Sequence, residues 1–151
     1  MSDLVFRPAT EADLPAIVAM LADDHLGAQR ESPDDLSPYR VALGHITNDP
    51  LLMQVICEHN GEIAGTMQVS ITPGLSRKGM SRANIEGVRV SSAVRGAGIG
   101  QKMFEWAINY AREQGCGLVE LTTDKSREDA HRFYDRLGFE PSHIGYKLKL
   151  V

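Results

Sequence analysis

The chain has 151 residues, of which 42% are hydrophobic and 24% charged, and its net charge at pH 7 is −4. This length and balance predict a single globular domain, residues 1–151, with a full hydrophobic core. The negative net charge argues against general nucleic-acid binding. No apolar run approaches the roughly 18 residues of a membrane span, and the amino terminus does not resemble a secretion signal. We therefore expect a cytoplasmic protein with neither a nucleic-acid nor a membrane partner.

Acidic residues gather in the first third of the chain. Residues 1–50 hold nine acids and three arginines, a balance of −6, so the remaining residues carry +2 of the whole-chain charge of −4. This distribution indicates either an entrance that attracts a cationic substrate or a solvated helix face.

The metal-ligating residue types are scattered. Cys57 and Cys116 lie far apart, and the five histidines show no ligand spacing. The sequence therefore predicts two free thiols in a reducing compartment and no metal site.

The first third predicts one strand and two helices. A β-rich run over residues 4–8 stops at a proline, as a first strand would. Thr10 and Asp13 resemble a capping box before a helix over about residues 11–23. A charged loop rich in Gly and Pro follows, and a second, shorter helix is expected from Ser37. Loops of this kind often shape a substrate entrance.

The middle of the chain predicts a β-hairpin. Two β-rich runs, residues 51–58 and 62–72, are joined through Asn60-Gly61, a sequence typical of a two-residue hairpin turn. A loop then leads to a further strand over residues 84–90.

The last third predicts two helices and two strands. Apolar residues recur at helical intervals up to Gly115, and residues 118–124 predict a strand. Ser126 with Asp129 resembles the start of another helix, and the alternating run over residues 143–151 predicts a last strand. The whole order favours an α/β domain, a mixed central β-sheet flanked by helices.

Three glycines stand between a strand and a helix in the stretch "VRVSSAVRGAGIGQKM". A helix start leaves unpaired N–H groups with partial positive charge, and Gly96, Gly98 and Gly100 would let them approach an anion closely. Arg95 adds a forked positive group. Neither the P-loop nor the dinucleotide-binding spacing is present. Phosphate binding and a merely structural turn therefore both remain open from spacing alone.

Two motifs make the interpretation more definite. "RGAGIG", residues 95–100, matches the Q/R-x-x-G-x-G/A pattern of the GNAT superfamily of acetyl-CoA-dependent N-acetyltransferases, and "AHRFYDRLGF", residues 130–139, resembles that family's A-x-x-x-Y-x-x-x-G-F segment. The chain therefore resembles a GNAT protein. It departs from the family at Arg127, where members often carry Asn.

The resemblance implies a GNAT fold in which two parallel strands, here residues 84–90 and 118–124, splay apart. It also implies that the pyrophosphate of acetyl-CoA lies on the amides of residues 95–100 and the pantetheine along residues 88–90. The implied cofactor-binding residues are Val88, Arg89, Val90, Arg95, Gly96, Ala97, Gly98, Ile99 and Gly100. Arg127 either contacts a phosphate of the coenzyme or is a solvated residue. No metal is implied.

The resemblance implies acetyl transfer to a primary amine by direct attack in a ternary complex. Tyr134 would protonate the departing thiolate; the alternative is an aromatic core residue. Glu86 would accept the ammonium proton, often through water; the alternative is a solvated or paired carboxylate. Attack by the small neutral fraction of amine would need no base.

Other functions remain open at this stage. The acidic first third suggests a cationic acceptor without selecting one. The rival hypotheses are a non-catalytic acyl-CoA-binding module of the same fold and a nucleotide-binding α/β domain. A homodimer is plausible for the family.

Overall fold

A computed structural model describes residues 3–151. Five strands form one sheet in the order β1-β2-β3-β4-β5, so each strand lies beside its neighbours in sequence. The first three pairings are antiparallel, and β4 pairs with β5 in parallel. The strands are β1 (Leu4–Pro8), β2 (Leu52–His59), β3 (Glu62–Thr72), β4 (Arg82–Val90) and β5 (Leu118–Glu120).

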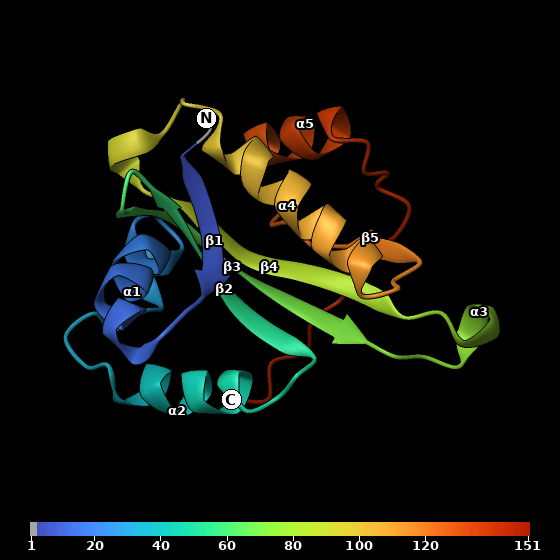
Figure 1. Cartoon of the computed structure of the whole chain (residues 1–151), viewed down its shortest axis with the longest axis horizontal. Coiled ribbons are helices and arrows are strands. Elements are labelled where there is room, and N and C mark those ends of the chain that lie inside the picture. The colour runs from blue at the N-terminus through green and yellow to red at the C-terminus, as the bar shows by residue number, and fades with distance from the viewer. Residues whose placement is uncertain (1–2) are drawn as a thin grey trace.

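Helices cover both faces of the sheet, with α1 and α2 on one side and α4 and α5 on the other (Figure 1). This layout confirms the expected mixed α/β fold. The helices are α1 (Leu14–Ala22), α2 (Ser37–Thr47), α4 (Ile99–Glu113) and α5 (Glu128–Arg136), with short 3₁₀ turns at Glu11–Asp13, Gly27–Gln29 and Ser92–Val94. The element α3 (Ser76–Gly79) contains a left-handed turn. Within residues 3–151, no helix is long and apolar enough to cross a membrane.

Local sequence signals account for several element boundaries. Asn60 and Gly61 have φ of 52° and 80°, the left-handed pair that a tight hairpin turn between β2 and β3 requires. Thr10 and Asp13 form the predicted capping box: the Asp13 carboxylate accepts the Thr10 amide N–H at 2.7 Å. Both predictions are confirmed.

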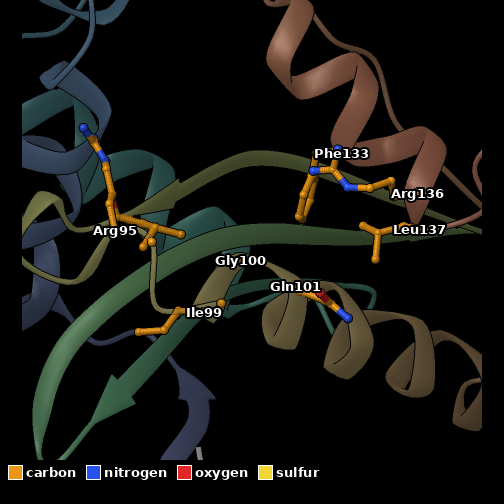
Figure 2. A pocket seen from close by; sticks show the side chains of 10 residues that line it. Arg95, Ile99, Gly100, Gln101, Phe133, Arg136 and Leu137 are labelled. Atoms are coloured by element: carbon orange, nitrogen blue, oxygen red, sulfur yellow. The ribbon is translucent and has the colours of Figure 1, made fainter.

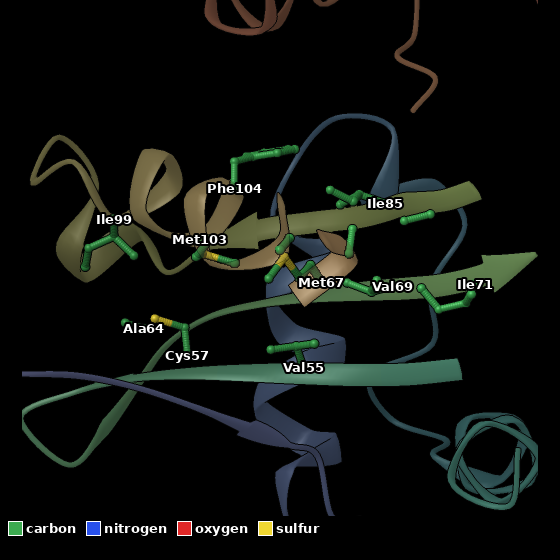
Figure 3. Close-up of a cluster of buried hydrophobic side chains, with 13 residues drawn as sticks. Val55, Cys57, Ala64, Met67, Val69, Ile71, Ile85, Ile99, Met103 and Phe104 are labelled. Carbon is green, nitrogen blue, oxygen red and sulfur yellow. The ribbon is translucent and has the colours of Figure 1, made fainter. Parts of the chain in front are cut away.

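Alternation along β2 divides the core into two layers. Val55 and Cys57 face α4, while Ile56 between them packs with Ile17 of α1 and Leu43 of α2. Figure 3 shows the larger layer, in which α4 lays its apolar face over the sheet. Its fully buried members include Val55, Met67, Val69, Ile85, Ile99, Met103 and Phe104.

A β-bulge interrupts the pairing of β3 with β4. Gln68 pairs with Glu86 and Thr66 pairs with Arg89, so β4 contains one residue more than β3 between these two pairs. Gly87, inside the bulge, has φ of 62°. Glu86 and Arg89 are three positions apart, so in a regular strand their side chains would lie on opposite faces of the sheet. The extra residue of the bulge places them on the same face.

The pairing of β4 with β5 ends early. It consists of Arg82–Leu118, Ala83–Val119 and Asn84–Glu120, whereas β4 continues to Val90. Beyond Asn84 the two parallel strands separate, as expected for this fold. The side of β4 that would face β5 therefore carries main-chain groups that β5 does not bind.

Three details of the last third differ from the predictions. The strand expected over 118–124 stops at Glu120 because its partner diverges. Ser126 does not cap α5; its hydroxyl instead donates to the Asp124 carboxylate at 2.6 Å, and Arg127 is the residue before the helix. Residues 143–151 form no strand: no sheet edge pairs with them, and Ile144, Tyr146, Leu148 and Leu150 are exposed.

One ion-pair network fastens β1 to the start of α1. Arg7 binds Asp13 through two hydrogen bonds of 2.7 and 2.9 Å and also contacts Glu58 at 3.1 Å. The Arg7 guanidinium lowers the pKa of the buried Asp13 to about 2, from an ordinary value of 3.8.

We predict that Asp13→Asn lowers the free energy of unfolding by about 2 kcal/mol at pH 7, since each pKa unit corresponds to about 1.4 kcal/mol. Because the pKa of Asp13 is lowered on folding, its contribution to the free energy of unfolding is complete above pH 3.8 and is lost as the pH falls toward 2. Urea denaturation from pH 7 to pH 2 measures it, with the exposed Asp34→Asn as control. A difference between wild type and Asp13→Asn that stays constant down to pH 2 would contradict the assignment.

Candidate functional site

The glycine-rich turn ends in the first turn of α4. Gly96 and Gly98 have φ of 87° and 77°, and Gly98 is the left-handed residue that precedes the helix. Among residues 3–151, no hydrogen bond uses the amides of Ile99, Gly100 or Gln101, and no side chain caps this helix. These amides and the helix dipole make the turn a candidate anion-binding position.

A cavity of about 440 Å³ opens beside these amides. It lies between the start of α4 and α5, as Figure 2 shows. A Cβ at Gly100 would lie 3.8 Å from both Phe133 Cζ and Val90 Cγ2, so the bare Cα keeps this part of the cavity open. The lining residues are Val90, Arg95, Gly96, Gly98, Ile99, Gly100, Gln101, Phe133, Arg136 and Leu137.

Two arginines border this cavity in different ways. Arg95 donates to the Val90 carbonyl at 3.3 Å and pairs with Asp23 at 3.2 Å, so its charge is partly neutralised. Arg136 comes from α5 on the opposite side (Figure 2). The sequence analysis missed Arg136 and Gln101; the spacing of Phe133 and Arg136 on one helix face is the signal that could have found Arg136.

The end of β4 separates two environments. Val88 and Val90 pack against the core layer under α4, next to the cavity. Arg89 points to the other face, pairs in register with Thr66 and contacts Asp24 at 3.5 Å. The structure therefore does not bring the Arg89 side chain into the cavity with its two neighbours.

Arg127 lies apart from the cavity lining. Its guanidinium binds the Asp24 carboxylate at 2.9 Å, across 103 positions of sequence. Ala97, the remaining residue of the glycine-rich turn, donates its amide to the Val94 carbonyl at 3.4 Å.

Tyr134 is half-buried among aromatic rings. Its ring lies edge-on to Phe104, at a centroid distance of 5.5 Å, and close to Phe133 and Phe139. Burial raises the pKa of the Tyr134 hydroxyl, while Arg127 and Arg89 lower it by a smaller amount. The hydroxyl therefore keeps its proton at neutral pH, as a proton donor must.

Glu86 is exposed on the opposite face of the sheet from α4. The Asn84 amide donates to its carboxylate at 3.4 Å, and Gln68 is its partner across the bulge. Ser70, which pairs with Asn84, continues a polar surface on this face. The structure thus gives Glu86 access to water and does not bring it into the cavity beside α4.

The residues present fit coenzyme A. Unpaired amides at a helix start suit a diphosphate, Arg136 supplies a further cation, and the unpaired edge of β4 offers groups for amide hydrogen bonds. Among residues 3–151, no three His, Cys, Asp or Glu side chains gather as a possible metal site.

Comparisons with known proteins agree with this geometry. Residues 14–139 match the acetyltransferase (GNAT) family. The chain is 29% identical over 140 residues to the aminoalkylphosphonate N-acetyltransferase of Salmonella typhimurium, covering 93% of this chain and 87% of that protein. It is 30% identical over 135 residues to the glucosamine 6-phosphate N-acetyltransferase of Trypanosoma brucei brucei, covering 77% and 90%.

A solved structure extends the likeness. The crystal structure of a transcriptional regulator from Bacillus halodurans C-125 has a TM-score of 0.92 and 47% identity, covering 97% of this chain and 99% of that one. The glycine-rich turn, the diverging strands and the family match over residues 14–139 lead to one conclusion. The chain belongs to the GNAT family of acetyltransferases.

Proposed function

We propose that this protein transfers the acetyl group of acetyl-CoA to a primary amine by direct attack in a ternary complex. The observation that carries the proposal is the set of unpaired amides at Ile99, Gly100 and Gln101 beside an open cavity. These donors suit the diphosphate of the coenzyme, and in this proposal the pantetheine runs along β4 past Val88 and Val90, which pack against the core. Cofactor binding is then mainly a property of the main chain.

In this proposal the acceptor approaches from the polar face of β4. Glu86 takes the proton from the ammonium through water, since its carboxylate is exposed. The amine nitrogen bonds to the acetyl carbon as the carbon–sulfur bond breaks. Tyr134 gives its proton to the coenzyme sulfur and is reprotonated, through water, by the second proton that the nitrogen loses as the amide forms. The bound coenzyme supplies the thioester, and the chain supplies position and proton transfer.

Part of the negative charge in the acidic first third is already paired within the chain. Asp13 pairs with Arg7, Asp23 pairs with Arg95, and Asp24 pairs with Arg127. The acceptors named for the Salmonella and Trypanosoma relatives carry both an amine and a phosphorus oxyanion, which supports a small acceptor of mixed charge.

The alternative is a non-catalytic acyl-CoA-binding module. The name of the Bacillus halodurans protein, a transcriptional regulator, supports this alternative. Release of free thiol from acetyl-CoA, measured across a broad panel of amines, separates the two functions. Binding of acetyl-CoA without amine-dependent thiol release would support the module and contradict the enzyme.

We predict that Tyr134→Phe lowers kcat by about 100-fold, the usual effect of removing a positioned proton donor, and changes the affinity for coenzyme A by less than about twofold. Steady-state kinetics and calorimetry measure the two quantities. Tyr110→Phe, which removes a hydroxyl from a ring stacked on Trp106, is the control. An unchanged kcat in Tyr134→Phe would exclude the hydroxyl as the acid.

We predict that Gly100→Val weakens coenzyme A binding at least tenfold, because its methyl groups would enter the space between Val90 and Phe133. Gly100→Ala, whose Cβ lies at ordinary contact distance, should have a smaller effect. Gly44→Ala is the matched control, because its Cβ would meet nothing within 4 Å in α2. Equal affinities in all three variants would place the coenzyme elsewhere.

We predict that Arg136→Gln weakens coenzyme A binding about tenfold at low salt, with a smaller difference at high salt as the charge is screened. Arg132→Gln on the same helix is the control, because Arg132 is exposed and pairs with Asp129. The prediction fails if the two variants bind coenzyme A equally well.

A further inference from the structure

Three segments distant in sequence meet at one carboxylate. Asp24 follows α1, Arg89 lies near the end of β4, and Arg127 precedes α5. Both arginines contact the same oxygen, Oδ2 of Asp24, Arg127 at 2.9 Å and Arg89 at 3.5 Å. The other oxygen accepts the Gly27 amide N–H at 2.6 Å. One carboxylate therefore contacts two guanidinium groups.

The arginine cluster has unused hydrogen-bonding capacity. The Arg89 side chain is 18% exposed, and its Nη1 donates only to the Val88 carbonyl, at 2.8 Å. Within the described part of the chain, its Nε is buried and has no hydrogen-bond partner. A buried donor without an acceptor is costly, and a ligand oxyanion would satisfy it once the Arg89 side chain turns to expose its Nε.

The other nearby charges nearly balance. Arg30 and Glu31, from the loop after α1, both act on Arg89 and offset each other. The Tyr39 hydroxyl donates to the Glu31 carboxylate at 3.0 Å. On the other side of the cluster, the exposed Asp124 carboxylate acts on Arg127. The capacity for an anion therefore lies in the unused donors of Arg89, whose contact with Asp24 is 3.5 Å long, and not in a surplus of charge.

This cluster lies on the acceptor side of the proposed transfer site. The bulge puts Arg89 and Glu86 on the same face of β4, opposite α4. Arg89 and Arg127 are also both close enough to Tyr134 to act on the pKa of its hydroxyl. A group bound by the two arginines would thus lie beside the proposed proton donor and outside the cavity that α4 borders.

We propose that Arg89 and Arg127 bind an oxyanion of the acceptor, so that the acceptor is a small primary amine that also carries a phosphate, phosphonate or carboxylate. The proposal rests on the proposed N-acetyltransferase function. Asp24 holds the two arginines in position in the free protein. The oxyanion competes with Asp24 for Arg127 and takes the unused Nε–H of Arg89, and two guanidinium groups match the several oxygens of such an anion.

The test uses the full chain and acceptors that differ in one group: an aminoalkyl phosphonate, the corresponding phosphate and carboxylate, the neutral amino alcohol and a diamine. Thiol release from acetyl-CoA should give a kcat/KM at least 100-fold higher for the anionic acceptor that fits than for the amino alcohol, with the diamine lowest. The anionic arms distinguish a phosphorus oxyanion from a carboxylate.

Arg127→Gln should raise the KM for the anionic acceptor at least tenfold with a smaller change in kcat. Arg89→Lys, which keeps the charge but loses the Nε–H fork, should also raise this KM. Arg132→Gln, an exposed arginine of α5, should leave it unchanged. Circular dichroism and Tm identify any variant that fails to fold. If Arg89→Lys does not fold, the KM of Arg127→Gln alone tests the proposal.

Inorganic phosphate provides an independent measurement. It should inhibit competitively against the amine, and Arg127→Gln should weaken this inhibition at least tenfold. Competition against acetyl-CoA is expected from the amides at the start of α4 and should persist in Arg127→Gln. Loss of the competition against acetyl-CoA in that variant, with inhibition against the amine retained, would assign the arginines to the coenzyme and overturn the proposal. Turnover of neutral amines or diamines with no preference for anionic acceptors would overturn it while the enzyme function stands. A rise in Tm with the anionic amines but no thiol release would overturn the enzyme function while the oxyanion site stands. If there is neither a rise in Tm nor thiol release, both proposals are overturned.

Discussion

The early separation of β4 from β5 is the constraint on which the rest of the structure depends. The two strands pair only as far as Asn84 and Glu120, yet β4 continues for six more residues, to Val90. Main-chain donors and acceptors that are left unpaired inside a domain need partners. A ligand rich in amide and phosphate groups can supply them. The turn after β4, the first turn of α4 and the position of α5 all surround this opening.

The bulge in β4 gives the two faces of the strand different chemistry. Val88 and Val90 are apolar and face α4, where they pack with the core. Glu86 and Arg89 are charged and face the side covered by α1. In the proposed reaction, acetyl-CoA on one side of the strand and the amine on the other can therefore meet through the gap between β4 and β5. Binding of either molecule leaves the packing on the opposite face unchanged.

Short-range features of this fold and site could be predicted from the sequence. Asn60-Gly61 identifies the hairpin because both residues readily adopt the left-handed conformation of a tight hairpin turn. Gly96 and Gly98 identify the turn before α4 because glycine adopts positive φ without strain. Features set by distant contacts could not. Arg127 meets Asp24 across 103 positions, and the bulge appears only once β3 fixes the register of β4. The alternation in residues 143–151 predicts a strand wrongly, because alternation does not specify a neighbouring edge.

The strand order has a consequence for how the chain acquires its structure. Because β1 to β5 lie side by side in the order in which they occur, most of the sheet forms from contacts between segments close in sequence. We expect the β2–β3 hairpin, joined by a two-residue turn, to form early and β4 to extend it. The opening at β4 requires the parallel crossover through α4 to β5. We therefore expect the half that contains α4, β5 and α5 to order last, on the antiparallel strands that have already formed.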